Sequence, residues 1–245
     1  MLMKKKLNSL KFFVCAIAIL LCLPASSAGA MHIMEGYLPV GWCALWGVLC
    51  LPFLVWGGIS LKKRMEGDSK TKILLAMAGA FVFVLSSLKI PSVVGSCSHP
   101  TGTGLGAVLF GPSVMAVLGI IVLLFQAILL AHGGLSTLGA NTFSMAVAGP
   151  FLSYGIFVLL KKTKCPKSVA VFLAAAVGDL FTYCITSGQL AMAFPGESIA
   201  SSFATFMGIF ALTQIPIAIA EGILSVIVYN VLEKYCVKEL SILGV

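Results

Sequence analysis

Long runs of apolar residues, separated by short polar or glycine-rich stretches, form the main pattern of this chain. Beyond residue 30 the pattern predicts seven apolar helices, at about residues 40–61, 73–90, 104–111, 113–131, 142–160, 168–187 and 203–232. Most of these runs approach the roughly 20 residues that a helix needs to cross a bilayer. The third run is too short to cross alone as a straight helix, so we expect it to be tilted or broken and buried among the others.

Composition supports the same fold class. Of the 245 residues, 60% are hydrophobic and 10% are charged, whereas charged residues make up roughly 25% of soluble domains. The sequence therefore predicts an all-α, multi-pass membrane protein. The net charge of +8 does not indicate a nucleic-acid partner, because the basic residues stand in small clusters beside apolar runs, as topology signals do.

These basic clusters predict the orientation of the chain. They lie after the first, fifth and seventh runs, and their members are Lys62, Lys63, Arg64, Lys70, Lys72, Lys161, Lys162, Lys164, Lys167, Lys234 and Lys238. Positively charged loops favour the cytoplasmic side. If the short third run counts as a crossing, every cluster is cytoplasmic, the mature N-terminus is outside and the C-terminus is inside. We expect the protein in the bacterial cell (inner) membrane.

Residues 1–30 have the pattern of a secretory leader. A basic segment that includes Lys4, Lys5 and Lys6 precedes an apolar stretch of about a dozen residues, and Ala28-Gly29-Ala30 fits the small-x-small cleavage rule. We predict a cleavable signal peptide at 1–30 and one polytopic domain at 31–245. The alternative is an uncleaved first helix. Cleavage after Ala30 makes Met31 and His32 the first two residues of the mature chain.

A free amine followed by histidine is a metal-chelating arrangement. The Met31 amine and the His32 amide nitrogen close one chelate ring, and that amide nitrogen and the His32 imidazole Nδ1 close a second. Three nitrogens then lie in a plane, which suits Ni(II), Cu(II) or low-spin Co(II). His99, in the Gly-, Ser- and Thr-rich segment 89–112, is the natural fourth donor. The alternative for each histidine is an ordinary place in an outer loop.

Further polar residues surround these candidates. All three histidines of the chain, His32, His99 and His132, fall on the predicted outer side. For His132, next to a glycine-rich turn, we favour a structural or supporting role. The candidates for supporting hydrogen bonds are Glu35, Ser96, Ser98, Thr101, Thr103 and Asn141, of which Asn141 could instead cap a helix.

Two acidic residues interrupt the last two apolar runs. Asp179 and Glu221 are costly inside a bilayer and usually face the protein interior or a cavity. We favour a buried helix-bonding role, with a proton- or metal-coupled role as the alternative. No HExxH motif supports an intramembrane metalloprotease, and no GxxxxGK[ST] phosphate loop is present. ATP would therefore be hydrolysed by another protein.

Three segments together resemble the CbiM family of cobalt-specific substrate-capture (S) components of energy-coupling factor (ECF) transporters. They are MHIMEGYLPVGWCALW, KIPSVVGSCSHPTGTGLGAVLFGPS and HGGLSTLGANTFSMAVAGP. The resemblance implies an S-component bundle, a non-catalytic role in ATP-driven cobalt import for cobalamin biosynthesis, and metal held by Met31, His32 and His99. It implies three partners: a CbiN-like small membrane protein, a CbiQ-like coupling protein and a CbiO-like ATPase. The alternatives are the same role for nickel and a proton-coupled secondary metal transporter.

Overall fold

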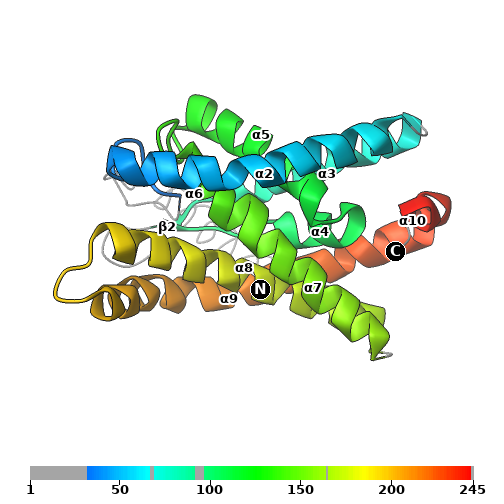
Figure 1. Ribbon diagram of the computed structural model, residues 1–245. Coiled ribbons are helices and arrows are strands. Elements are labelled where there is room, and N and C mark those ends of the chain that lie inside the picture. Colours follow the sequence, from blue (N-terminus) through cyan, green and yellow to red (C-terminus); the bar gives the residue numbers. More distant parts are fainter. Residues whose placement is uncertain (1–31, 67–68, 92–96, 164, 244–245) are drawn as a thin grey trace, which may run out of the picture.

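The computed structural model describes residues 32–66, 69–91, 97–163 and 165–243. Most of its long helices run lengthwise beside one another in a bundle (Figure 1). The elements are α2 (Val40–Met65), α3 (Ser69–Ser87), β1 (Ile90–Pro91), β2 (Cys97–Ser98), α4 (Thr103–Phe110), α5 (Pro112–Leu130), α6 (Leu138–Asn141), the π-helix η2 (Thr142–Ala148), α7 (Gly149–Lys162), α8 (Lys167–Ala193), α9 (Ile199–Tyr235) and α10 (Val237–Leu243). Met31 and the predicted leader lie outside the described residues.

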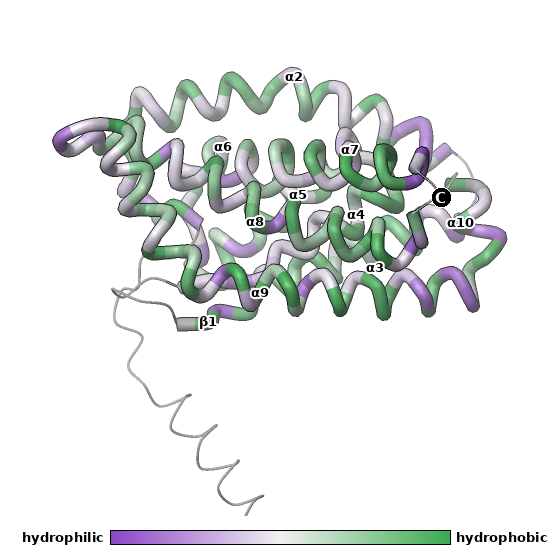
Figure 2. Tube along the Cα trace, turned by 90° about the horizontal axis from the view of Figure 1, so that it is seen from below, coloured by the Kyte–Doolittle hydropathy of each residue, from purple (hydrophilic) through white to green (hydrophobic). Residues whose placement is uncertain are grey.

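The helical membrane fold predicted from the apolar runs is confirmed. Within the described ranges, six stretches are long and apolar enough to cross a membrane, and α6, η2 and α7 form one of them together. Hydrophobic residues dominate along these helices (Figure 2). Many large apolar side chains on them are exposed, as expected for surfaces that face lipid. The protein is therefore a multi-pass membrane protein.

The short third run is the exception to the predicted count of seven. It forms α4, an eight-residue helix in which every residue is buried. At about 1.5 Å per residue, α4 is roughly 12 Å long and cannot cross a bilayer alone. The chain from His99 through α4 nevertheless leads inside the bundle to Gly111, where an added methyl group would lie 3.9 Å from the Arg64 guanidinium. A buried loop and a short helix thus take the place of a full third span.

Basic residues gather at one end of the bundle. Three of them, Lys62, Lys63 and Arg64, lie in the last turn of α2, and Lys161 and Lys162 lie in the last turn of α7. The same end contains the ion pair between the Lys70 ammonium and the Glu239 carboxylate, at 3.1 Å. Because the cluster-bearing helices α2 and α7 both end here, the grouping agrees with a shared membrane side for these charges.

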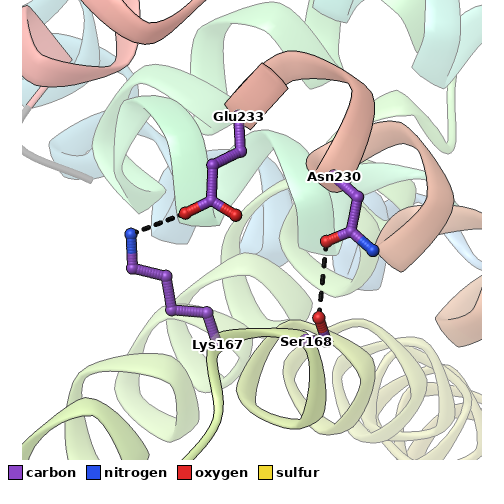
Figure 3. Close-up of polar contacts among 4 residues, drawn as sticks. All are labelled: Lys167, Ser168, Asn230 and Glu233. Atoms are coloured by element: carbon purple, nitrogen blue, oxygen red, sulfur yellow. Dashed lines mark hydrogen bonds and ion pairs between the residues drawn. The ribbon is translucent and has the colours of Figure 1, made fainter.

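The start of α8 and the last turns of α9 are tied together at this basic end (Figure 3). Lys167 Nζ donates to Glu233 Oε1 at 2.9 Å, and the Ser168 hydroxyl donates to Asn230 Oδ1 at 3.3 Å. Both members of the ion pair are about half exposed, so the pair adds little stability. The contacts mark where α8 and α9, which carry residues that reach the histidines, lie side by side at this end.

Small residues allow the helices of the interior to approach closely. A methyl group on Gly178 of α8 would collide with the Ser153 hydroxyl of α7, and one on Gly57 of α2 would collide with the Ser113 carbonyl of α5. Close contact through small residues is the usual way in which helices associate in membranes. It leaves a tight interior in which the loops between helices hold their side chains in fixed places.

Candidate metal centre

The segment before α2 folds into the bundle and buries its histidine. His32 is 2% exposed. Asn141 holds the next residue with both ends of its amide: Oδ1 accepts from the Ile33 N–H at 2.8 Å, and Nδ2 donates to the Ile33 carbonyl at 3.0 Å. The Thr137 hydroxyl donates to the same carbonyl at 2.6 Å. These bonds fix the backbone directly after His32 and therefore the direction of its imidazole.

The turn after α5 supplies a second histidine and leaves room for that segment. Directly after α5, Ala131 has a left-handed conformation with φ of 46°, and Gly133 has φ of 80°. A methyl group on Gly133 would lie 3.3 Å from His32 Cβ, and one on Gly134 would lie 2.5 Å from Glu35 Cα. The two glycines that follow His132 thus permit the close approach of two backbones.

The third histidine follows the small sheet. β1 and β2 pair antiparallel, with Ile90 opposite Ser98, and His99 comes next, fully buried. Its carbonyl oxygen accepts from the Tyr183 hydroxyl of α8 at 3.1 Å and from Gln214 Nε2 of α9 at 3.3 Å. Two helices that are distant in sequence from this loop therefore hold it in place.

These three loops bring the three imidazoles together. The ring centroids of His32 and His99 are 4.6 Å apart, those of His32 and His132 are 4.5 Å apart, and those of His99 and His132 are 5.0 Å apart. One ring nitrogen from each side chain lies within 4.8 Å of the other two. Imidazole is the commonest protein ligand for transition metals. The cluster has the composition and compactness that such an ion requires.

Hydrogen bonds determine which nitrogens are free to bind. His99 Nδ1 lies 3.0 Å from the Pro100 carbonyl, which only accepts, so Nδ1 carries the proton and Nε2 has a lone pair without a partner. His32 Nε2 lies 3.2 Å from the sulfur of Met145, a weak acceptor in the π-helix η2, which leaves Nδ1 unpaired. Neither ring nitrogen of His132 has a hydrogen-bond partner among the described residues. One metal ion bound by all three rings would give these buried nitrogens a partner.

Burial keeps the three histidines neutral. It lowers the pKa of His99 to about 4 and that of His132 to about 2, and it places the pKa of His32 well below its usual value. The neighbouring histidines and Lys89 add to the effect, because another positive charge close by is unfavourable. Metal binding requires a neutral imidazole with a free lone pair. At neutral pH the three rings are already in this form and need not lose a proton first.

Of the predicted metal ligands, the structure brings His32 and His99 together. Met31 lies outside the described residues, so its amine stays a prediction. His132, for which we favoured a supporting role, joins them: its ring centroid lies 4.5 Å from that of His32 and 5.0 Å from that of His99. The sequence signal was present in the common outer position of all three histidines, but residues 100 apart do not reveal their contact.

The predicted supporting residues divide into two groups. Asn141 and Glu35 join the segment before α2 to the region after α5: Asn141 holds Ile33, and the exposed Glu35 accepts from the Ser136 N–H at 3.1 Å. The others do not hydrogen-bond to a histidine ring: Ser98 pairs with Thr213, Thr101 bonds Glu221, and Thr103 donates to Thr101. Ser96 lies outside the described residues.

The sequence did not point to Met145, Tyr183 or Gln214, which contact His32 or His99. All three lie within long apolar helices, where a methionine or tyrosine looks like an ordinary packing residue. A polar Gln214 in the middle of an apolar run was the one available signal, because buried amides need hydrogen-bond partners.

The fold and the site together define an integral membrane protein with a buried histidine cluster suited to a transition-metal ion. The model of the CbiM family, described as a cobalt uptake substrate-specific transmembrane region, matches residues 32–238. The chain therefore belongs to the CbiM family. It is a membrane component of cobalt uptake, a transport protein rather than an enzyme, and cobalt is the ion that its family carries.

Individual relatives agree with this assignment. The cobalt transport protein CbiM of Chlorobium limicola is 67% identical over 210 residues, which cover 85% of this chain and 83% of that protein. The cobalt transport protein CbiM of Ruminiclostridium cellulolyticum is 57% identical over 245 residues, 98% of each chain. A crystal structure of a truncated transition metal transporter has a TM-score of 0.71 and 28% identity, covering 83% of this chain and 99% of that one.

Replacing Gly134 by alanine is expected to weaken metal binding at least tenfold, a loss of about 1.4 kcal/mol. The added methyl group meets the Glu35 backbone at 2.5 Å, so the segment that carries His32 must move. Isothermal titration of the purified protein with Co(II) measures the effect. Gly155→Ala, where nothing lies within 4 Å, is the matched control. Equal affinities in the two variants would show that the turn does not set the position of His32.

Acidification is expected to destabilise the metal-free protein. His99 has a pKa of about 4 when folded and about 6.5 when unfolded, so between these values the unfolded state binds more protons and stability falls as pH falls. The loss from His99 alone reaches roughly 2 kcal/mol at pH 5. Thermal unfolding in detergent with a chelator, at pH 7.5 and pH 5, measures it. His99→Gln should reduce the difference, and an equal pH response in this variant would contradict the assignment.

Proposed function

We propose that this chain is the substrate-capture subunit of an ATP-driven, ECF-type cobalt importer. Co(II) binds to His32, His99 and His132 on the outer side of the membrane. The observation that carries the proposal is the convergence of three buried, neutral imidazoles whose free nitrogens have no hydrogen-bond partner within the described ranges. The three imidazoles are neutral nitrogen donors and are softer than the carboxylates preferred by Mg²⁺ or Ca²⁺, so they favour late transition metals.

The Met31 amine completes the site in this proposal. A leader at residues 1–30 is removed after Ala30, and the new amine then stands one residue before His32. The unpaired Nδ1 of His32 is the nitrogen that closes the chelate ring with the His32 amide. Met145 supports this arrangement because its sulfur engages the other ring nitrogen, Nε2. The Asn141 clamp on Ile33 fixes the backbone beyond the chelate.

The distribution of charge supports an outer site. The basic clusters gather at the end of the bundle where α2 and α7 terminate, whereas His32 precedes α2 and His132 follows α5. Because basic loops face the cytoplasm, the mature N-terminus and the histidines face outward and the C-terminus faces inward. An importer must present its capture site on this side.

Energy for transport comes from partner proteins in this proposal. The chain contains no phosphate-binding loop, so a CbiO-like ATPase hydrolyses ATP, a CbiQ-like membrane protein couples it to this subunit, and a CbiN-like small membrane protein promotes loading. The imported cobalt supplies cobalamin biosynthesis. Nickel is the alternative cargo, because it accepts the same nitrogen donors.

Uptake of radioactive cobalt into vesicles that contain the full transporter tests this function. We expect uptake to require ATP in the compartment that corresponds to the cytoplasm. An imposed proton gradient should not substitute for this ATP. Uptake driven by the proton gradient alone would instead favour a secondary transporter that uses Asp179 and Glu221. Competition by unlabelled nickel, measured in the same assay, decides between the two metals.

A further inference from the structure

Two carboxylates that do not contact the histidine rings lie buried in the bundle. Asp179 on α8 is 1% exposed and Glu221 on α9 is 2% exposed. Ionisable groups inside a membrane are costly and are usually paired with specific partners. Asp179 accepts from Gln214 Nε2, the same amide that donates to the His99 carbonyl. The partners of Glu221 lead still more directly to the histidine loop.

Glu221 holds the backbone immediately after His99 and Pro100. Its Oε2 accepts from the Thr101 N–H at 2.5 Å, and its Oε1 accepts from the Gly102 N–H at 2.9 Å. The Thr101 hydroxyl also donates to Oε1, at 3.1 Å. A carboxylate with three donors is well satisfied without water, which explains how it can be buried here.

A single peptide unit connects this carboxylate to the imidazole of His99. The Thr101 N–H and the Pro100 carbonyl belong to the same planar group. Its N–H binds Glu221, and its oxygen accepts from His99 Nδ1 at 3.0 Å. Glu221 therefore fixes the oxygen that sets both the rotation of the ring and the position of its proton. The opposite nitrogen, Nε2, is left with an unpaired lone pair.

We propose that Glu221 is a positioning residue for metal capture, which acts on His99 through the Pro100–Thr101 peptide unit. Substituting a residue that orients a ligating histidine in this way commonly changes metal affinity by about 10- to 100-fold. The proposal rests on the function proposed above, in which His99 Nε2 binds the metal. It assigns a role in the metal site to a residue 122 positions away from His99 in the sequence.

A carboxylate suits this role better than an amide of the same size. Both oxygens of Glu221 accept a backbone N–H, whereas glutamine has one oxygen and one NH₂ group, which cannot accept. Glu221→Gln therefore loses one of the two backbone bonds in either orientation of its amide. Ser225→Ala is the matched control, because Ser225 is buried on the same helix and its hydroxyl has no hydrogen-bond partner in the part of the chain that the structure describes.

The test is a double-mutant cycle on the purified mature protein, titrated with Co(II) and followed by visible absorption. We expect Glu221→Gln to raise the Kd for Co(II) about tenfold, to shift the absorption bands toward those of His99→Ala, and to have no further effect when His99 is already alanine. Ser225→Ala should match the wild type. If Glu221→Gln does not yield folded protein, Glu221→Asp carries the same cycle, because it keeps both oxygens one methylene further from the loop.

Three outcomes separate the claims. Failure of the wild type to bind Co(II), or full binding by His99→Ala, overturns the proposed function. Normal Kd and spectrum in a folded Glu221 variant, with weakened His99→Ala, overturn the positioning role and leave the function standing. An equal loss from Glu221→Gln with and without His99 also overturns the positioning role, because the effect would then be a general destabilisation rather than one that acts through His99.

Discussion

Replacing His32 by alanine is expected to abolish measurable Co(II) binding, with a rise in Kd of at least about a thousandfold, or about 4 kcal/mol. The substitution removes Nδ1, the unpaired ring nitrogen of a side chain that is 2% exposed and centred 4.5 to 4.6 Å from its two neighbouring rings. In the proposed site it also opens the second chelate ring, so the amide nitrogen of residue 32 loses the geometry that favours its binding. Titration with Co(II) in detergent measures the loss.

His99→Ala gives the matched comparison for this result. It leaves the chelating N-terminus and His132 in place, so we expect a smaller rise in Kd, about 10- to 100-fold. Both variants replace a buried histidine by alanine and leave cavities of similar size. The midpoint of thermal unfolding without metal should therefore change by similar amounts. If His32→Ala binds as well as His99→Ala, the N-terminal segment is not the dominant part of the site.

Extending the mature N-terminus by two residues before Met31 is expected to reduce the affinity for Co(II) by about as much as His32→Ala does. The added residues move the free amine away from the His32 amide, so the first chelate ring cannot close. One added residue would be a weaker test, because its amine could rejoin the metal through an additional amide nitrogen. Mass spectrometry of the purified protein establishes the new N-terminus, and Co(II) titration then gives the Kd.

The control for the extension is Met31→Leu, which changes the side chain and keeps the amine in place. We expect this variant to bind like the wild type after cleavage at the same position. Wild-type affinity in the extended protein would exclude the amine as a ligand and would leave the three imidazoles as the complete protein donor set.

Apolar run length was sufficient to predict the helical membrane fold, and the limits of that prediction lie in α4. The run at 104–111 has the composition of a span but not its length, and its eight-residue helix is buried on all sides. Hydrophobicity alone does not distinguish a helix buried in lipid from one buried in protein. The loop from His99 to Thr103 completes the passage through the interior, where backbone groups find partners such as Glu221.

The residues of the site differ in how well the sequence alone could predict them. His32 was predicted from its place after the predicted cleavage site, and His99 from its polar loop. The place of His132 in the site depends on the glycine turn at 133–134. The close contact of this turn with Glu35 exists only in the folded chain. A buried helix-bonding role was expected for Glu221 and Asp179, but their actual partners, the His99 loop and Gln214, depend on how α8 and α9 pack. Such long-range pairs are not encoded in local spacing.

X-ray absorption at the cobalt edge of the mature protein, loaded with one equivalent of Co(II), tests the central claim most directly. We expect a coordination shell made of nitrogen, with the outer scattering that imidazole rings produce, and a reduced imidazole contribution in His99→Ala. An oxygen-dominated shell without imidazole scattering would contradict the assignment of the metal to His32, His99 and His132.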